Sequence, residues 1–299
     1  MVHTPVFTKE VLFYLDAKPG KHYIDATADG GGHTIAIIHA VQPDGKILAV
    51  EWDEELFQQL IRRLKKECSH FSKNYILRQA SYTALARLVR SLRFSPVAGV
   101  LFDFGISSFH LEVSRRGFSF QRAEELDMRY SRATSETAAQ ILARRTEKEL
   151  ETILKNFGQE RFAGRIAKGI SEARRRHPIR TTLELVAIIR KSTPQWYHRK
   201  RLHFATRTFQ ALRIAVNHEL ENIAQGLEAA AEVISPAGRI VTITFHSLED
   251  RTVKNFFRRP DIKPHFSAML EKPLRPQVCE IRNNPRARSA VLRAFEKIS

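Results

Sequence analysis

Residues 25–33 decide the fold of this chain and read Asp25-Ala26-Thr27-Ala28-Asp29-Gly30-Gly31-Gly32-His33. They follow a short apolar run at 23–24 and precede an apolar helical pattern over 35–41. A strand, a glycine turn and a helix in that order form half of a nucleotide-binding βαβ unit. Glycines let the backbone approach a ligand closely, and the helix directs its unpaired N–H groups and positive dipole end at that ligand.

A second apolar strand, over 46–50, ends in Glu51. A carboxylate about 20 residues after a glycine turn is placed to accept hydrogen bonds from ribose hydroxyls. The third glycine of a dinucleotide fingerprint would fall at Ile35, so a pyrophosphate cradle is disfavoured. The pattern favours an uncharged or zwitterionic nucleoside ligand such as S-adenosylmethionine, and the alternative is a tight turn that binds nothing.

A third strand, over 98–103, ends in Asp103, and Ser107 and Ser108 follow closely. A carboxylate that closes a buried strand is costly unless it has a partner or a role. In methyl transfer to an exocyclic amine, Asp103 with either serine could accept the amine hydrogens and keep the nitrogen lone pair aimed at the methyl group. The alternative is a structural role. Asp103 would then be the N-cap of a helix, and for the serines a structural role has equal weight with the catalytic one.

Composition bounds the class of protein. With 299 residues and 43% hydrophobic residues, the chain is long enough for about two domains. Its two cysteines, Cys68 and Cys279, exclude a disulfide scaffold and lack metal-ligand spacing, so we expect no metal site and a reducing, cytoplasmic location. The first 16 residues contain Lys9, Glu10 and Asp16, which is typical neither of a signal peptide nor of a membrane span.

The positive charge is concentrated in one segment. Of the net charge of +17, residues 161–213 carry +12, from 14 Lys and Arg against Glu172 and Glu184. Such clustering is typical of proteins that bind a phosphate backbone. A solvated basic surface is the alternative. An anionic membrane is disfavoured, because no long amphipathic helix with a wide apolar face accompanies the charge.

The order of elements predicts a parallel, doubly wound α/β sheet interrupted by helices. We expect strands at 22–25, 46–50, 75–78, 98–103, 239–245, 277–282 and 290–296, and helices at 33–41, 54–67, 82–93 and 219–234. Between 112 and 209 only helices are expected, over 136–143 after a Ser135 cap, 147–156 after a Thr146 cap, 161–175 and 182–191. The predicted organisation is residues 1–111 and 210–299 as one α/β domain, with a basic, all-helical RNA-recognition domain at 112–209.

Several longer motifs resemble those of one family, the bacterial small-subunit ribosomal RNA N4-cytosine methyltransferases known as RsmH or MraW. The similarity runs nearly end to end, and several long motifs in the right order are specific where one alone would not be. The motifs are 3–6, 25–33, 103–108, 116–120, 126–129, 160–163, 205–211, 245–251 and 284–289.

The resemblance implies an enzyme that uses S-adenosylmethionine, with a Rossmann-like sheet split by a helical domain. Its implied target is the N4 amine of a decoding-region cytidine in 16S ribosomal RNA, within the 30S subunit or a late assembly intermediate. Whether the protein is a monomer or a homodimer stays open. The resemblance places cofactor contacts at Gly31, Gly32, His33, Glu51, Tyr82, Asp103 and His110, and catalysis at Asp103, Ser107 and Ser108.

The chain departs from the family pattern at three of these positions and at Asp29 in the glycine turn. Asp29 stands where glycine is usual, Glu51 replaces Asp, Tyr82 replaces Phe, and His110 replaces Gln. The carboxylates that the chemistry needs are retained. The change at His110 puts that contact in doubt, and Asp29 alters the charge of the turn.

Two other functions stay open. A DNA amino-methyltransferase would normally show an Asp/Ser-Pro-Pro-aromatic segment where 103–106 reads Asp-Phe-Gly-Ile. A non-catalytic assembly factor that binds ribosomal RNA on a methyltransferase scaffold would not need Glu51 and Asp103. A covalent pyrimidine intermediate is not required for N4, and neither cysteine lies near a predicted site.

Other residues have two interpretations. His246, Glu249 and Asp250 would line a cytidine pocket, or Glu249 and Asp250 would open the next helix through its dipole, with equal weight. We expect Asp127 and Arg129 to hold the helical domain together, and 284–288 to form a turn whose arginines meet phosphate. For Phe118, Phe120 and Trp196, we favour a place in the core over stacking on a base.

Overall fold

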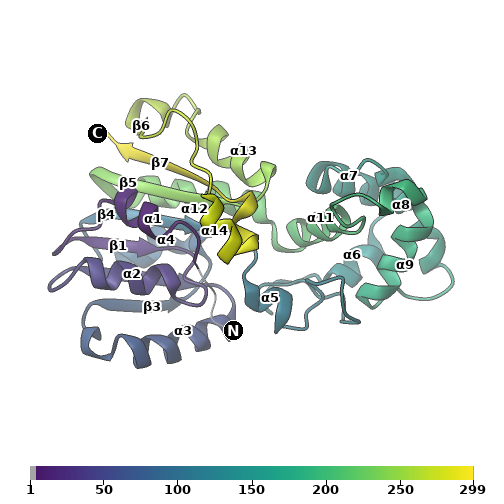
Figure 1. Ribbon diagram of the computed structural model, residues 1–299, viewed down its shortest axis with the longest axis horizontal. Coiled ribbons are helices and arrows are strands. Elements are labelled where there is room, and N and C mark those ends of the chain that lie inside the picture. Colours follow the sequence, from purple (N-terminus) through teal and green to yellow (C-terminus); the bar gives the residue numbers. More distant parts are fainter. Residues whose placement is uncertain (1–4, 299) are drawn as a thin grey trace. The chain divides into compact units, whose positions relative to one another are not determined.

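The computed structural model describes residues 5–298, so His3 and Thr4 of the first family motif lie outside the described residues. The chain forms two compact units (Figure 1). The α/β unit contains the residues up to Gly105 together with those from Leu220 onward, and the helical unit runs from Ile106 to Glu219. In the described part of the chain, no helix has the length and apolar character needed to cross a membrane.

A seven-stranded sheet forms the centre of the α/β unit, in the order β3-β2-β1-β4-β5-β7-β6. Strands β1 to β5 are parallel, whereas β7 is antiparallel to both of its neighbours. The strands are β1 (His22–Asp25), β2 (Lys46–Glu51), β3 (Tyr75–Gln79), β4 (Val97–Asp103), β5 (Ile234–Thr244), β6 (Phe266–Ala268) and β7 (Val291–Lys297). The predicted Rossmann-like α/β fold with a helical insertion between β4 and β5 is confirmed.

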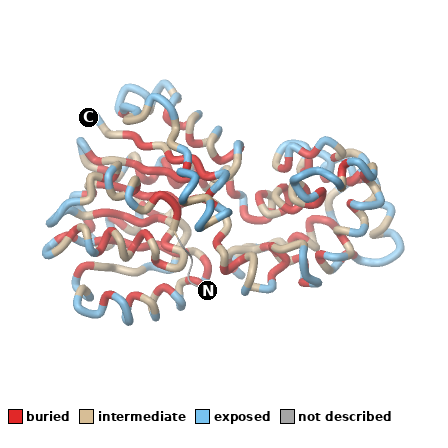
Figure 2. The backbone as a smooth tube through the Cα atoms, in the orientation of Figure 1, coloured by how far each residue is buried: buried red, intermediate tan, exposed pale blue. Residues whose placement is uncertain are grey.

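Alternate residues of the strands belong to two different cores, one on each face of the sheet, because successive side chains of a strand point to opposite faces. Ile47 and Ala49 join one core, and Leu48 and Val50 join the other. The first core is covered by α1 (Thr8–Leu15), α2 (Gly32–Ala40) and α3 (Glu54–Glu67), and the second by α4 (Leu85–Leu92), α12 (Glu219–Val233) and α13 (Ser247–Phe256). The inner strands are accordingly buried over most of their length (Figure 2).

The strand predicted at 277–282 is wrong, since this segment forms α14 (Val278–Asn283). Its backbone makes helical hydrogen bonds, from Ile281 N to Gln277 O at 3.0 Å and from Asn284 N to Glu280 O at 2.7 Å. Strand β7 is instead flanked by β5 along most of its length and by β6 at its end. The three-residue strand β6 is too short to show in the sequence pattern.

The helical unit has a core of its own. It consists of α5 (Ser108–Glu112), α6 (Ala138–Arg144), α7 (Glu147–Gly158), α8 (Ala163–Arg174), α9 (Thr182–Ser192), α10 (Gln195–His198) and α11 (Thr206–Asn217). Ile141, Leu150, Ile166, Leu185 and Leu212 are buried at its centre. Among its described residues the only β pairing is a single bridge between Glu125 and Thr181, which confirms the prediction of no strand over 112–209.

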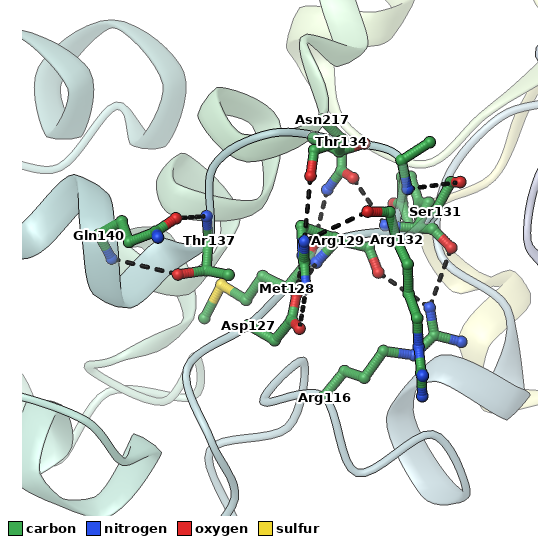
Figure 3. Close-up of polar contacts among 12 residues, drawn as sticks. Arg116, Asp127, Met128, Arg129, Ser131, Arg132, Thr134, Thr137, Gln140 and Asn217 are labelled. Atoms are coloured by element: carbon green, nitrogen blue, oxygen red, sulfur yellow. Dashed lines mark hydrogen bonds and ion pairs between the residues drawn. The ribbon is translucent and has the colours of Figure 1, made fainter.

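Two helix starts test the capping predictions. Thr146 caps α7 as expected, with its side chain accepting a hydrogen bond from Glu149 N. The cap of α6 is Thr137 and not Ser135, since Thr137 Oγ1 accepts from Gln140 N at 3.2 Å and Gln140 Oε1 accepts from Thr137 N at 2.9 Å (Figure 3). This reciprocal pair is a capping box, which satisfies two otherwise unpaired N–H groups.

Asp127 and Arg129 hold the loop before α6, as the sequence predicted. Arg129 donates two hydrogen bonds to Asp127, from Nε to Oδ1 at 2.7 Å and from Nη2 to Oδ2 at 2.9 Å (Figure 3). Burial alone would raise the pKa of Asp127, but the hydrogen bonds from Arg129 outweigh it and lower that pKa. Arg116 donates to Arg129 O at 3.0 Å and Asn217 donates to Met128 O at 2.7 Å, so one loop is fixed to two distant segments.

Candidate functional site

Three buried carboxylates lie at the carboxyl ends of neighbouring strands. Asp25 closes β1, Glu51 closes β2 and Asp103 closes β4, and their exposed fractions are 1%, 6% and 8%. Because β1 lies between β2 and β4, these strand ends are adjacent at one edge of the sheet. In an open α/β sheet this edge is where ligands bind.

The turn after β1 is shaped by its glycines and by Asp25. Asp25 Oδ2 accepts a hydrogen bond from Thr34 Oγ1 at 2.6 Å, which ties the end of β1 to the first turn of α2. Gly31 has a φ of 82° and precedes α2 without a capping side chain, so N–H groups of the first turn stay available to a ligand. A Cβ on Gly32 would lie 2.8 Å from Pro5 Cγ, so that position needs glycine for packing.

Glu51 is anchored through the backbone of the turn and of the next helix. Its Oε2 accepts from Asp29 N at 2.8 Å and its Oε1 accepts from Asp53 N at 2.7 Å. Burial, joined by the nearby Asp53 carboxylate, raises the pKa of Glu51 to about 8 despite these hydrogen bonds. Burial and the charge of Glu51 also raise the pKa of Asp29, so the two carboxyl groups disfavour each other's ionisation.

Asp103 faces His33 across the edge of the sheet. His33 Nε2 lies 3.5 Å from Asp103 Oδ2, and both side chains are almost fully buried. Asp103 N donates to Thr27 Oγ1 at 2.6 Å, which fixes the strand end against the glycine turn. Among the described residues, Asp103 Oδ1 and His33 Nδ1 have no hydrogen-bond partner, and buried polar atoms of this kind normally have one, so both atoms are suited to bind a polar ligand.

Tyr82 lies in the short 3-10 turn that follows β3. Its ring packs edge-on against Phe102 and Phe104, with centroids 5.8 Å apart in each case. Gly226 of α12 makes room for it, since a Cβ there would lie 2.5 Å from the Tyr82 ring. The half-buried ring presents a surface on which an adenine could stack.

Ser107, Ser108 and His110 belong to the helical unit. Ser107 is the N-cap of α5, and its Oγ lies 3.0 Å from His110 Nδ1 within a capping box. The His110 ring also packs against Phe118 and Tyr130, with centroids 5.0 and 4.9 Å away. Ser107 and His110 therefore have structural roles at the start of α5, and the proposed catalytic and cofactor roles of these three residues stay predictions.

The end of β5 carries a second ordered cluster. Glu249 Oε2 accepts from Phe245 N at 2.7 Å, and Glu249 Oε1 lies 3.0 Å from His246 Nε2. His246 and Glu249 form the capping box of α13, which confirms the helix-opening interpretation. No motif indicated that Thr27 would accept a hydrogen bond from Asp103 N, or that His33, a predicted cofactor contact, would lie beside Asp103.

The helical unit is strongly basic at its surface. None of its 14 Lys and Arg residues over 161–213 is buried. A pocket of about 510 Å³ is lined by Arg174, Arg175 and Arg180 together with Ala139, Gln140, Leu142, Ala143, Pro178 and Ile179. Arg174 is fixed there because it donates to Leu142 O and Arg145 O at the end of α6, at 2.5 and 2.6 Å.

The sheet order and the carboxylates at its edge define a Rossmann-like methyltransferase that uses S-adenosylmethionine. A model of the MraW methylase family matches residues 1–298, and the chain belongs to that family. It is 42% identical to the ribosomal RNA small subunit methyltransferase H of Dictyoglomus thermophilum, over 99% of this chain and 97% of the relative. It is 39% identical to the protein of the same name from Syntrophotalea carbinolica, over 99% and 98%.

Among solved structures, a putative rRNA-methylase from Clostridium thermocellum is similar over 98% of both chains, with a TM-score of 0.48 and 12% sequence identity.

The residues of the α/β edge fit S-adenosylmethionine. Glu51 accepts hydrogen bonds from Asp29 N and Asp53 N, and a carboxylate has further acceptor capacity for ribose hydroxyls. The unpartnered Nδ1 of His33 suits the polar amino-acid end of such a ligand. Tyr82 supplies an aromatic surface, so the edge offers a contact for each part of the molecule.

Proposed function

We propose that this protein methylates the exocyclic N4 of a cytidine in 16S ribosomal RNA, cytidine 1402 in the family's numbering of that RNA. The observation that carries the reaction is Asp103, a buried carboxylate with one unpartnered oxygen at the edge where the methyl donor is expected. The relatives supply the class of RNA, because they are named ribosomal RNA small subunit methyltransferases.

The chemistry assigns one main task to Asp103. S-adenosylmethionine, when bound, supplies an electrophilic methyl group. Asp103 Oδ1 accepts a hydrogen bond from the N4 amine, which keeps the nitrogen lone pair directed at that group. As positive charge develops on N4, Asp103 stabilises it and receives the proton. Ser107 and Ser108 are proposed as further partners of the amine, and no covalent bond to the protein is required.

The helical unit is proposed to recognise the RNA. Its charge of +12 over 161–213 and its exposed cations suit a phosphate backbone. We propose that the substrate is the 30S subunit or a late assembly intermediate in the cytoplasm, and that Gly31, Gly32, His33, Glu51, Tyr82 and His110 contact the methyl donor. The enzyme acts as a monomer or a homodimer.

Mass spectrometry of 16S ribosomal RNA tests the reaction and the target together. RNA from a deletion strain should lack a single N4-methylcytidine, and the wild-type gene should restore it. Retention of that nucleotide in the deletion strain would contradict the proposal. Equilibrium binding of S-adenosylmethionine excludes the scaffold alternative, since a non-catalytic assembly factor should show none.

The role of Asp103 is tested by Asp103→Ala. Loss of a positioned general base lowers the rate about 10²- to 10⁴-fold. We expect transfer to 30S particles to fall by this factor while circular dichroism stays unchanged. Asp44→Ala, which removes an exposed carboxylate elsewhere in the α/β unit, is the matched control. Near-normal transfer by Asp103→Ala would refute the role.

A further inference from the structure

Trp196 is an exposed aromatic residue on the helical unit. Its exposed fraction is 47%, so the core position favoured by the sequence analysis is wrong for this residue. Phe118, by contrast, is 5% exposed within the core, and Phe120 packs against that core beside His203. A half-exposed aromatic ring beside cations is a combination that nucleic-acid-binding surfaces use.

Cations surround the Trp196 ring. The Arg161 guanidinium carbon lies 5.5 Å from its ring centroid, and Lys200 Nζ lies 5.0 Å from it. Arg161 and Arg165 each lie 5.8 Å from the neighbouring Phe162 ring. The negative faces of the rings attract these cations and hold them close to the aromatic surface.

The ring stands on a fixed scaffold. Trp196 contacts Phe162 and Tyr197 edge-on, with centroids 5.8 and 5.9 Å apart. Tyr197 OH donates to Glu160 Oε2 at 2.9 Å, and Phe162 N donates to Glu160 Oε1 at 3.0 Å. Burial and Glu160 raise the pKa of Tyr197 to about 12, so its hydroxyl stays a donor at neutral pH.

The positive charge at this surface is not neutralised. Glu160 is 3% exposed and is occupied by Tyr197 and Phe162. In the described part of the chain, Arg161, Arg165 and Lys200 form no ion pair with a carboxylate. An anionic partner would therefore gain from all three cations.

We propose that Trp196 is a stacking site for an unpaired base of RNA, with Arg161, Arg165 and Lys200 on the adjacent phosphates. The inference rests on the proposed function, which makes RNA the ligand. Proteins that bind single-stranded RNA combine aromatic rings with a positively charged surface in this way. A protein partner would be expected to meet a wider apolar patch with fewer uncompensated cations.

Tryptophan fluorescence of the full-length protein tests the stacking. The chain has two tryptophans, and Trp196→Phe identifies the signal of Trp196 by difference. Single-stranded oligouridylate should quench that signal, whereas an oligonucleotide of equal length and charge without bases, and a duplex RNA, should quench it little. Equal quenching by the base-free oligonucleotide would overturn the proposal.

Affinity for oligouridylate gives a second readout. We expect Trp196→Ala to weaken binding about 10-fold, as for loss of one stacked base, and Trp196→Phe to recover part of it. Arg161→Gln should weaken binding more than Arg176→Gln, since Arg176 is an exposed arginine of the same unit without an aromatic neighbour in the described residues. Wild-type affinity in Trp196→Ala would overturn the proposal.

These experiments distinguish failure of the proposed methylation from failure of the proposed stacking site at Trp196. Trp196→Ala should bind S-adenosylmethionine normally and should raise KM for 30S particles with little change in kcat. If the wild-type protein makes no N4-methylcytidine but shows base-dependent quenching, the proposed reaction is wrong and the stacking site stands. If methylation occurs and the quenching does not depend on bases, the stacking site is wrong alone.

Discussion

Asp29 occupies an unusual position for a non-glycine residue in the turn after β1. It is half-buried, has a φ of 43°, and donates its N–H to Glu51. A left-handed backbone costs a non-glycine residue about 1 kcal/mol. A glycine at this position would lower the free energy of unfolding by about 0.5–1 kcal/mol, because glycine has more conformational freedom to lose when the chain folds. These backbone effects nearly cancel, so the carboxylate itself decides how the substitution affects stability.

Asp29→Gly should therefore stabilise the protein at high pH and not at low pH. Burial raises the pKa of both Asp29 and Glu51 in the folded state, Glu51 from 4.5 to about 8. Because these folded-state pKa values exceed the unfolded-state values, the two groups contribute their full stabilisation below about pH 4. This contribution falls as pH rises toward 8. Removing one carboxyl group should reduce that loss by on the order of 1 kcal/mol.

The free energy of unfolding in urea, measured at pH 4 and pH 9 without ligand, checks this prediction. The Asp29→Gly variant should exceed the wild type at pH 9 and match it closely at pH 4. Asp44→Asn, which removes an exposed charge, should show no such pH dependence. An equal difference at both pH values would mean that the backbone, and not the charge, sets the effect.

At the scale of single elements, the start of α6 shows that the surrounding structure decides which of two possible residues caps a helix. Ser135 and Thr137 are both capping residues by type, two positions apart. The structure selects Thr137, because Gln140 completes its capping box and Ala138 then enters the core. Glu136 is directed elsewhere, to Arg145 Nη2 at 2.6 Å.

Thr137→Ala should lower the free energy of unfolding of the helical unit by about 1 kcal/mol, since it removes an N-cap. Ser135→Ala, at an exposed position without a capping role, should stay within about 0.5 kcal/mol of the wild type. Thermal or urea unfolding of the two variants side by side gives the answer. A larger effect of Ser135→Ala would place the helix start where the sequence pattern put it.

At the scale of the whole molecule, the chain builds two separately packed units from one continuous sequence. It leaves the α/β unit after Gly105 and returns to it at Leu220. The helical unit buries its own apolar cluster, and Asn217 near its end bonds Met128 O near its beginning at 2.7 Å. Each unit thus has the packed interior that independent folding requires.

Residues 106–219 expressed alone should fold and bind RNA, and should not bind S-adenosylmethionine. Far-UV circular dichroism should show a helical spectrum with a cooperative thermal transition. RNA affinity should fall steeply with salt, because binding releases counterions from the phosphate backbone. An unfolded fragment, or one whose RNA affinity ignores salt, would contradict this assignment of the two units.

Much of the fold was predictable because its signals are local. The apolar runs that end at Asp25, Glu51 and Asp103 predicted three strands to within a residue or two. The strand prediction at 277–282 was wrong because it rested on a few apolar residues, whereas the segment is largely exposed, pairs with no strand among the described residues and forms α14. Trp196 misled because composition alone does not say whether a ring faces a core or solvent.

The sequence by itself determined the strand ends, the glycine turn, the helical insertion and its charge, since each depends on residues close together in the chain. Only the tertiary structure decided that β7 lies beside β5, that His33 meets Asp103, and that Asp29 and Glu51 share a buried site. These features arise from contacts between residues far apart in sequence. Such contacts form when the sheet and its helices pack, and no local pattern encodes them.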